Sequence, residues 1–267
     1  MIAVGGFDPS GGAGLLADAK TIEQHGVPGL GVCTALTYQN ENTIEKIDWL
    51  TNEQVILQLK VLFEKYFPAV AKIGIVRDAE MLNAIIEFLL SKNKNIRIIW
   101  DPVVASSSGF DFHSGKNNWM SALKNIFLIT PNIPEAKAIT GIDDEERAAV
   151  FLAKQCNVLL KGGHSSSDTS NDLLFENSPL PRRGGRGEDV SKNDFEKIIS
   201  ISGEKFSRTK HGTGCVLSSA IASNLTLGKN LEESCRAAKE YVTQFILSND
   251  GLLGSHHQIN ISHEQII

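Results

Sequence analysis

Short apolar runs alternate with longer amphipathic stretches along most of the chain. The apolar runs have the length of strands, and their nearly continuous hydrophobicity is typical of strands buried on both faces. The longer stretches repeat apolar residues at helical spacing. The predicted strands are 2–7, 31–36, 70–76, 96–100, 126–130 and 158–160. The predicted helices are 12–25, a run from the capping box Thr51–Gln54 to Phe63, 81–90, 145–153, 216–225 and 231–247.

This alternation predicts an α/β fold, with a mostly parallel central sheet and helices on both of its faces. Neither an internal repeat nor a linker interrupts the pattern, so we expect residues 1–267 to form a single domain. Only the segment 177–192 departs from it, because it has almost no apolar residues and is rich in Pro, Gly and Arg. That composition predicts an exposed, flexible loop, with phosphate binding as the alternative.

The composition excludes several classes of protein. The net charge is -5 and no basic stripe is visible, which argues against a nucleic-acid partner. Apolar runs stay well short of the roughly 20 residues that span a membrane. The four cysteines, Cys33, Cys156, Cys215 and Cys235, form no C-x-x-C pair. We therefore expect neither zinc nor disulfides, and a reducing, cytoplasmic location.

The first candidate for chemistry is the glycine-rich loop Gly5–Gly14, at the end of the first predicted strand. Glycines let a backbone approach a ligand closely, and open α/β sheets bind ligands at the carboxyl ends of their strands. A tight strand-to-helix turn is the simpler interpretation. Five glycines in ten residues exceed what such a turn needs, which favours a functional loop.

Part of the same loop fits a dinucleotide-binding fingerprint. Gly12-x-Gly14-x-x-Ala17 has the required spacing, but Asp8–Gly11 separate it from the strand. Glu41 is the only candidate for the acidic residue that should hold a ribose. An NAD-dependent oxidoreductase is therefore a remote alternative. The sequence contains no Walker A motif.

A second glycine turn, His211–Cys215, immediately precedes a predicted helix. The free amides and positive dipole of a helix N-terminus suit an oxyanion or a transferring phosphoryl group. In the first turn of that helix, the pKa of the Cys215 thiol should fall, so that a thiolate could accept a proton from an attacking hydroxyl. The alternative is a small buried cysteine that packs the helix start.

Hard oxygen ligands follow two other predicted strands. Asn132 and Glu135 come just after 126–130, and Asp101 ends 96–100. Carboxylate and amide oxygens suit Mg²⁺, although Asn-x-Pro-Glu is also an ordinary helix start. Lys161 and the glycines after it end a further strand and permit close approach to phosphates.

Taken in order, these motifs resemble the ribokinase-like superfamily and, within it, the hydroxymethylpyrimidine kinase branch. The resemblance covers most of the chain. It is carried by Gly6–Gly14 with Asp18 and Lys20-Thr21, Thr34–Asn40, Lys72-Ile73-Gly74, Asp101-Pro102-Val103, Thr130–Ala136, Lys161–His164 and His211–Cys215.

The resemblance implies a three-layer sandwich that uses ATP and Mg²⁺ to phosphorylate a hydroxymethylpyrimidine and then its monophosphate. The substrate residues that it implies are Gly6, Asp18, Gln39, Ile75 and Val103. Gly212, Thr213 and Gly214 would form the anion hole, with Cys215 as the catalytic base. The implied nucleotide residues are Lys161, Thr209, Asn132 and Glu135, and the implied metal ligands are Glu135 and Asp101.

One departure concerns the residues before the second glycine turn. The family usually has Asn-Thr there, whereas this chain has Thr209 and Lys210, which bears on the nucleotide contact of Thr209. A pyridoxal or pyridoxine kinase is the nearest alternative function, because that ring also carries a hydroxymethyl group. A non-catalytic binding module is the third. The resemblance further implies a homodimer.

Overall fold

The computed structural model describes residues 1–103, 119–162, 169–177, 197–204 and 206–257. The strands are β1 (Ile2–Phe7), β2 (Leu30–Gln39), β3 (Ile44–Trp49), β4 (Val70–Ile73), β5 (Arg97–Trp100), β6 (Leu128–Ile129), β7 (Asn157–Leu160), β8 (Thr169–Glu176) and β9 (Lys197–Glu204). The helices are α1 (Gly14–Gln24), α2 (Asn52–Phe63), α3 (Ala79–Lys92), α4 (Met120–Leu123), α5 (Ile133–Thr140), α6 (Glu145–Ala153), α7 (Thr213–Thr226) and α8 (Leu231–Leu247).

The strands form one sheet in the order β3-β2-β1-β4-β5-β6-β7-β8-β9. The pairs from β2 through β1 and β4 to β7 are parallel. The pairs of β3 with β2, β8 with β7, and β9 with β8 are antiparallel. The predicted α/β class with a mostly parallel sheet is confirmed, and the antiparallel strands lie at its two edges.

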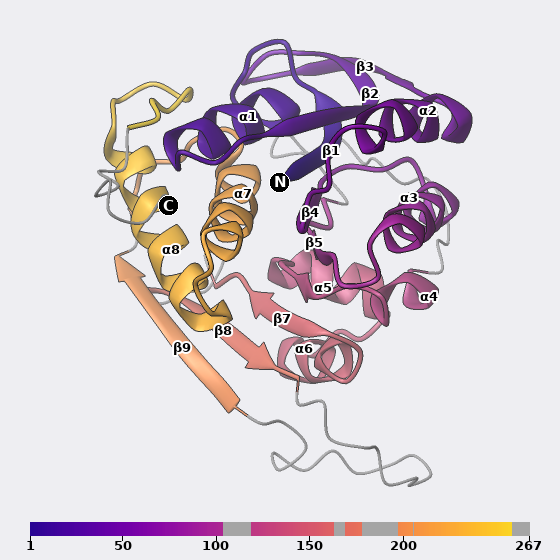
Figure 1. The fold of residues 1–267 in the computed structure, drawn as a ribbon. Helices are drawn as coiled ribbons and strands as arrows, with labels where there is room; N and C mark the ends of the chain where they lie inside the picture. The colour runs from indigo at the N-terminus through magenta and orange to yellow at the C-terminus, as the bar shows by residue number, and fades with distance from the viewer. Residues whose placement is uncertain (104–118, 163–168, 178–196, 205, 258–267) are drawn as a thin grey trace, which may run out of the picture.

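Helices cover both faces of this sheet, as Figure 1 shows, with α1, α7 and α8 on one side and α2, α3 and α6 on the other. Neighbouring residues of a strand enter different cores. Ile2 and Val4 of β1 pack with α2 and α3, whereas Ala3 packs with α1 and α7. Each face therefore has its own hydrophobic core, as a three-layer sandwich requires.

Local signals set several helix starts. The Thr51–Gln54 capping box is present at α2, where each side chain accepts a hydrogen bond from the other residue's amide. A second capping box, Asn230–Glu233, begins α8. The predicted bounds of α6 and α8 are confirmed. No helix of the described part is apolar over enough residues to cross a bilayer.

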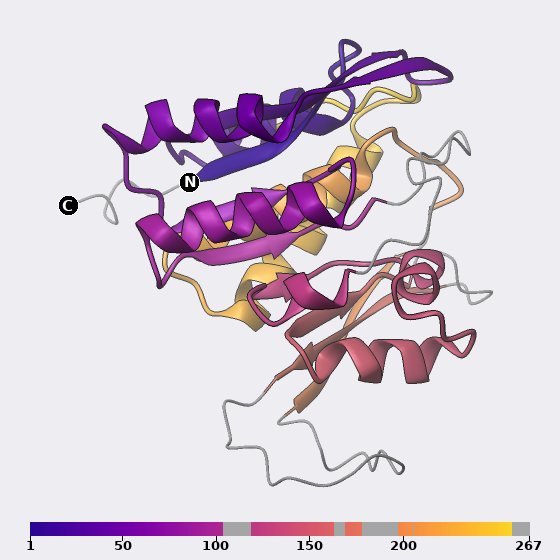
Figure 2. The same ribbon diagram turned by 90° about the vertical axis from the view of Figure 1, so that its right-hand side faces the viewer.

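Sequence periodicity missed the edge strands β3 and β9, and also β8, which lies between β7 and β9. It gave α5 only a start, and the predicted strand 70–76 ends at Ile73. Edge strands are short of continuous apolar runs because one side of the strand has no neighbour. Beyond Leu36, β2 leaves β1 and pairs only with β3, forming an extension that projects from the sheet in Figure 2. Apart from Asn177, the predicted loop 177–192 lies outside the described residues.

Candidate active site

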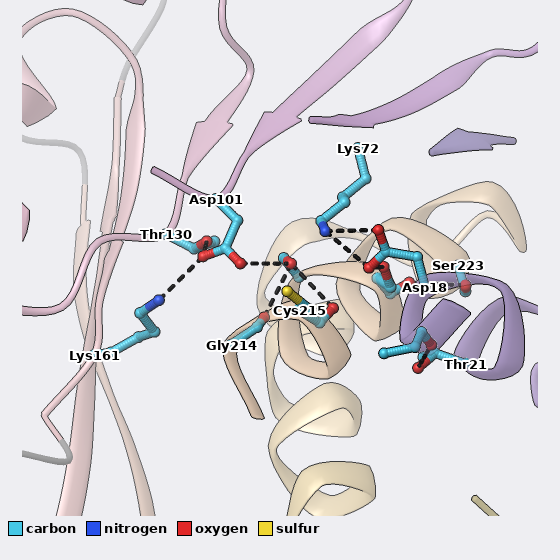
Figure 3. Close-up of polar contacts among 12 residues, drawn as sticks. Asp18, Thr21, Lys72, Asp101, Thr130, Lys161, Gly214, Cys215 and Ser223 are labelled. Atoms are coloured by element: carbon cyan, nitrogen blue, oxygen red, sulfur yellow. Dashed lines mark hydrogen bonds and ion pairs between the residues drawn. The ribbon is translucent and has the colours of Figure 1, made fainter. Parts of the chain in front are cut away.

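The predicted site residues converge at the carboxyl edge of the parallel strands. β1 ends in the first glycine loop, β5 is followed by Asp101, and β7 by Lys161. The N-terminus of α7 faces this edge, so that Asp101, Lys161 and Cys215 lie together in Figure 3. A Cβ built on Gly214 would lie 3.4 Å from Lys161 Nζ and 3.5 Å from Asp101 Oδ2. These residues therefore lie at the carboxyl ends of the strands, which is where open α/β sheets bind their ligands.

The two glycine loops touch each other through their backbones. Gly212, at φ 77°, is the N-cap of α7, and a Cβ there would overlap the carbonyl oxygen of Gly12. Gly14 has φ 56° and approaches the carbonyl of Gly6 in the same way. Positive φ and backbone contact together require glycine at both positions. The first loop and the start of α7 thus form one continuous wall.

Asp8 organises the first loop from within. Its carboxylate accepts hydrogen bonds from the amides of Ser10 (2.9 Å) and Ala13 (2.8 Å). The Nε2 atom of His211 lies 3.0 Å from Asp8 Oδ2. Burial alone would raise the pKa of Asp8, but these hydrogen bonds outweigh it and lower the pKa. An ionised Asp8 therefore joins the first loop to the second.

At α7, the first intrahelical bond runs from the amide of Val216 to the carbonyl of Gly212, at 3.0 Å. The amides of Thr213, Gly214 and Cys215 precede that bond and lie outside the helical ladder. They carry the positive end of the helix dipole. This turn is suited to hold an anion.

Cys215 lies at the start of α7 as predicted, but the prediction that its thiol has a lowered pKa is wrong. The residue is only 9% exposed, and burial raises the pKa of its thiol to about 11. The positive charge of Lys72 acts in the opposite direction without overcoming burial. The helix terminus by itself would lower the pKa of the thiol, but the thiol is packed under the first glycine loop, and its desolvation has the larger effect. Cys215 is a neutral thiol in this conformation.

A cluster of charged side chains, Lys161, Asp101 and Glu135, lies beside Cys215. Lys161 Nζ is 3.1 Å from Asp101 Oδ1 and 3.5 Å from Glu135 Oε2. Burial alone would raise the pKa of Asp101, but Lys161 and Lys72 hold it below its usual range. Burial and the charge of Asp101 raise the pKa of Glu135. Two carboxylates thus share one ammonium, in a site that reaches solvent through Lys161, whose side chain is 16% exposed.

Glu135 also has a structural task. Asn132 and Glu135 form a capping box that begins α5, with hydrogen bonds of 2.7 and 2.8 Å. The helix-start interpretation of this motif is therefore confirmed. The side-chain oxygen of Asn132 and Oε2 of Glu135 are both engaged in the cap. Asp101 and Glu135 are carboxylates, whose charge suits a metal ion better than the neutral amide of Asn132 does.

Within the described ranges, no group of three or more His, Cys, Asp or Glu is arranged to hold a metal. Mg²⁺ in kinases is commonly held by one or two carboxylates together with phosphates and water. Asp101 and Glu135 with their excess negative charge fit that pattern.

Asp18 lies on the other side of Cys215. Lys72 Nζ contacts both of its oxygens, at 2.8 and 2.9 Å, and Ser219 donates to Oδ1 at 2.8 Å. The side chains of Asp18 and Lys72 have no exposed surface. Burial works against a charged Lys72, but Asp18 outweighs it and raises the pKa of the ammonium. The pair is a sealed ion pair, and in this conformation Asp18 presents no surface to a substrate.

Comparison with known proteins identifies the chain. A family model described as phosphomethylpyrimidine kinase matches residues 8–260. The chain belongs to the phosphomethylpyrimidine kinase family. The hydroxymethylpyrimidine/phosphomethylpyrimidine kinase of Aquifex aeolicus is 33% identical, over 97% of this chain and 98% of the relative. That of Staphylococcus aureus strain MSSA476 is 32% identical, over 92% of this chain and 87% of the relative.

Solved structures agree. The phosphomethylpyrimidine kinase of Clostridium difficile 630 has 33% sequence identity and a TM-score of 0.69, with 91% of this chain and 97% of that chain covered. A Staphylococcus aureus pyridoxal kinase in complex with ADP has a TM-score of 0.77 at 22% identity, over 97% of this chain and 93% of that one. At that identity the likeness shows the fold alone. The resemblance drawn from the motifs is confirmed.

The remaining predicted residues of this family member are spread around the same edge. Gly6 is buried against Ile75, since a Cβ on Gly6 would lie 2.6 Å from Ile75 Cδ1. Val103 is half-buried just after Asp101. Gln39 is half-buried at the end of the β2–β3 extension, opposite Ile44. Thr209 is exposed. Gly6, Ile75 and Val103 therefore lie at or just beyond the ends of β1, β4 and β5.

The hydrogen-bond partners of the two buried aspartates, Asp101 and Asp18, were not predicted from the sequence. Thr130 donates to Asp101 at 3.2 Å, and Ser218 lies 3.3 Å from the other oxygen of that carboxylate. Lys72 was part of a quoted motif, but it was given no role. A lysine within the apolar strand β4 was a usable signal, because a buried lysine almost always has a partner. The serines of α7 gave no such signal, because serine is mostly exposed in proteins and its burial here cannot be seen in the sequence.

Proposed function

We propose that this chain transfers the γ-phosphoryl group of ATP to the hydroxymethyl oxygen of 4-amino-5-hydroxymethyl-2-methylpyrimidine, and then a second phosphoryl group to the resulting monophosphate. The observation that carries the proposal is the start of α7. The first-turn amides at Thr213, Gly214 and Cys215 lie beside the Asp101–Lys161–Glu135 cluster, since a Cβ built on Gly214 would lie 3.4 Å from Lys161 Nζ. The thiol of Cys215 belongs to the same turn. The names of the relatives support the same pair of reactions.

In the first transfer, the hydroxymethyl group must lose a proton. Burial keeps Cys215 protonated in the closed conformation, so its thiol gives up its proton to solvent when the first glycine loop opens. The thiolate then takes the proton from the hydroxyl. The oxygen attacks the γ-phosphorus, and the bond between that phosphorus and the leaving oxygen of ADP breaks. The amides at the start of α7 stabilise the charge that develops on the transferring group.

Lys161 and the two carboxylates lie where the phosphates would come. Asp101 and Glu135 would hold Mg²⁺, which supplies charge neutralisation to the phosphates when it is bound. Lys161 would contribute a second positive charge. Asn132 would keep Glu135 oriented through the capping box. Thr209, exposed next to the second glycine turn, is proposed as a nucleotide contact.

On the substrate side we propose Gly6, Asp18, Gln39, Ile75 and Val103. For Asp18 to bind a ring directly, the first glycine loop must open, because the carboxylate has no exposed surface here. The family resemblance also implies a homodimer, and the composition of the chain favours a cytoplasmic protein without nucleic-acid or membrane partners. Light scattering of the purified protein tests the dimer.

The experiment that tests the function is ATP consumption with hydroxymethylpyrimidine, its monophosphate and pyridoxal in parallel. We expect turnover with both pyrimidines. Turnover with pyridoxal alone would instead favour a pyridoxal kinase. No turnover with any of the three, together with a change in NADH absorbance, would favour the oxidoreductase that the Gly12-x-Gly14 spacing suggested.

A further inference from the structure

The segment that follows α8 folds into a compact loop of residues 248–255, the C-terminal loop. Asn249 organises it. Its Oδ1 accepts from the amide of Gly251 at 2.9 Å, and its Nδ2 donates to the carbonyl of Leu253 at 3.1 Å and to Ser255 Oγ at 3.2 Å. The amide of Ser255 closes the loop by donating to Ser248 Oγ at 2.8 Å. The loop is therefore a defined structural unit.

This loop is docked where the two glycine loops meet. The amide of His211 donates to the carbonyl of Leu252 at 2.9 Å. A Cβ built on Gly12 would lie 2.7 Å from Leu253 Cδ2 and 2.6 Å from the His211 ring. The C-terminal loop thus contacts the first glycine loop at Gly12 and the second at His211. His211 in turn directly precedes Gly212, the N-cap of α7.

Two cations in the segment before His211 hold the C-terminal loop in different ways. Lys210 is 5% exposed, and its ammonium donates to the carbonyl (2.6 Å) and side-chain oxygen (2.7 Å) of Asn249 and to the carbonyl of Gly251. Arg208 pairs with Asp250, but these side chains are 52% and 86% exposed. An exposed ion pair contributes little, whereas a buried ammonium is tolerated only when its donors are satisfied.

The three donors of Lys210 meet three uncharged oxygens, all on the C-terminal loop. The hydrogen bonds of Lys210 connect segments that are distant in sequence, because they join the residue before His211 to residues 249 and 251.

We propose that Lys210 is a positioning residue for phosphoryl transfer, which fixes the C-terminal loop against His211 and Gly12 and so holds the anion-binding turn at the start of α7 in place. The proposal rests on the function proposed for that turn. Its physical basis is orientation: the amides stabilise a transition state only when they point at it, and a small displacement lowers the rate strongly.

The test compares Lys210→Met with Arg208→Met, which removes the exposed cation from the same attachment. We expect Lys210→Met to lower kcat roughly tenfold or more for both pyrimidine acceptors, with little change in the KM for the pyrimidine. Arg208→Met should stay within about twofold of the wild type. Assays at several temperatures well below each unfolding midpoint separate positioning from partial unfolding, since only the latter loss disappears on cooling.

Equal kcat values for the two variants, or a loss that disappears on cooling, would overturn the proposal. If Lys210→Met does not fold, Asn249→Ala replaces it. This variant removes one acceptor of the ammonium together with the side-chain hydrogen bonds that organise the loop, and it keeps the two carbonyls. An unchanged kcat in that variant would also overturn the proposal.

Hydrogen exchange at residues 211–215 provides a measurement that does not depend on activity. We expect faster exchange in Lys210→Met than in Arg208→Met. A wild-type protein that phosphorylates neither pyrimidine would refute the proposed function, while the exchange comparison would still decide whether Lys210 holds the turn.

Discussion

Two lysines are buried at the carboxyl edge of the sheet, and their surroundings differ in charge and in exposure. Lys72 faces a single carboxylate, Asp18, and neither side chain reaches solvent. Lys161 faces two carboxylates, Asp101 and Glu135, and is 16% exposed. Cys215 lies between the two lysines in Figure 3, and a charge on its sulfur would interact with both.

The difference in charge separates two tasks. A sealed pair with balanced charge suits a fixed element of the core, because a charge can be buried only when its partner is always present. A cluster with surplus negative charge and an opening suits mobile ligands, which bring positive charge as Mg²⁺ and negative charge as phosphate. We therefore propose that the Lys72–Asp18 pair stabilises the closed conformation around the Cys215 thiol, and that the Lys161 cluster receives the nucleotide.

The largest effect should come from breaking the sealed pair. Lys72→Met leaves Asp18 buried without its cation, and we expect a loss of about 3–5 kcal/mol in the free energy of unfolding. Urea denaturation measures it. Lys161→Met is the matched control and should cost clearly less, because water can reach that site.

The double variant Lys72→Met/Asp18→Asn sharpens the same comparison. Removing both charges should cost much less than the sum of the single losses, since no unpaired charge remains. Additive losses would show that Lys72 and Asp18 do not act as a pair.

The next effect concerns the thiol between the two lysines. Cys215→Ala should lower kcat for hydroxymethylpyrimidine by roughly 10²-fold or more, as expected for a lost general base. For the monophosphate we expect a much smaller loss, because a phosphate with a second pKa near 6 is already ionised at neutral pH and needs no base. Steady-state kinetics with both acceptors decides this. Equal losses for the two would argue against Cys215 as the base.

A smaller effect should follow from reducing the surplus charge beside Lys161. Glu135→Gln keeps the capping box, because glutamine also accepts at that position, but it removes one negative charge. We expect the apparent affinity for Mg²⁺ to fall about tenfold, with pyrimidine binding little changed. A Mg²⁺ titration of the initial rate that matches the wild type would remove Glu135 from the proposed metal ligands.

The smallest effect lies away from both lysines, on the β2–β3 extension. Gln39→Leu should raise the KM for hydroxymethylpyrimidine by roughly three- to tenfold with little change for ATP, and should narrow any preference over pyridoxal. The amide can both donate to and accept from a pyrimidine edge, but at a half-buried position water replaces part of that interaction. Equal losses in kcat/KM for the two rings would show that Gln39 shapes the extension and does not contact the ring.

The glycines and the strand ends were predictable because they are local. Gly212 and Gly14 occupy positions with positive φ, and the capping boxes at α2 and α5 are encoded within four residues. The edge strands β3 and β9 were missed because half of such a strand's environment is solvent, which weakens the hydrophobic pattern. The ionisation of Cys215 was wrongly predicted, since the helix terminus is visible in the sequence but the burial of the thiol is not.

The sequence by itself determined the α/β class, the motif order that places this chain in its family, and the ends of the parallel strands β1, β5 and β7. Tertiary structure alone decided which of those residues are neighbours and which charges are balanced. Asp18 and Lys72 are 54 positions apart, and Lys210 meets Asn249 across 39. The reason is physical: propensity and periodicity act over a few residues, whereas desolvation and ion pairing depend on what the whole fold brings within a few ångströms.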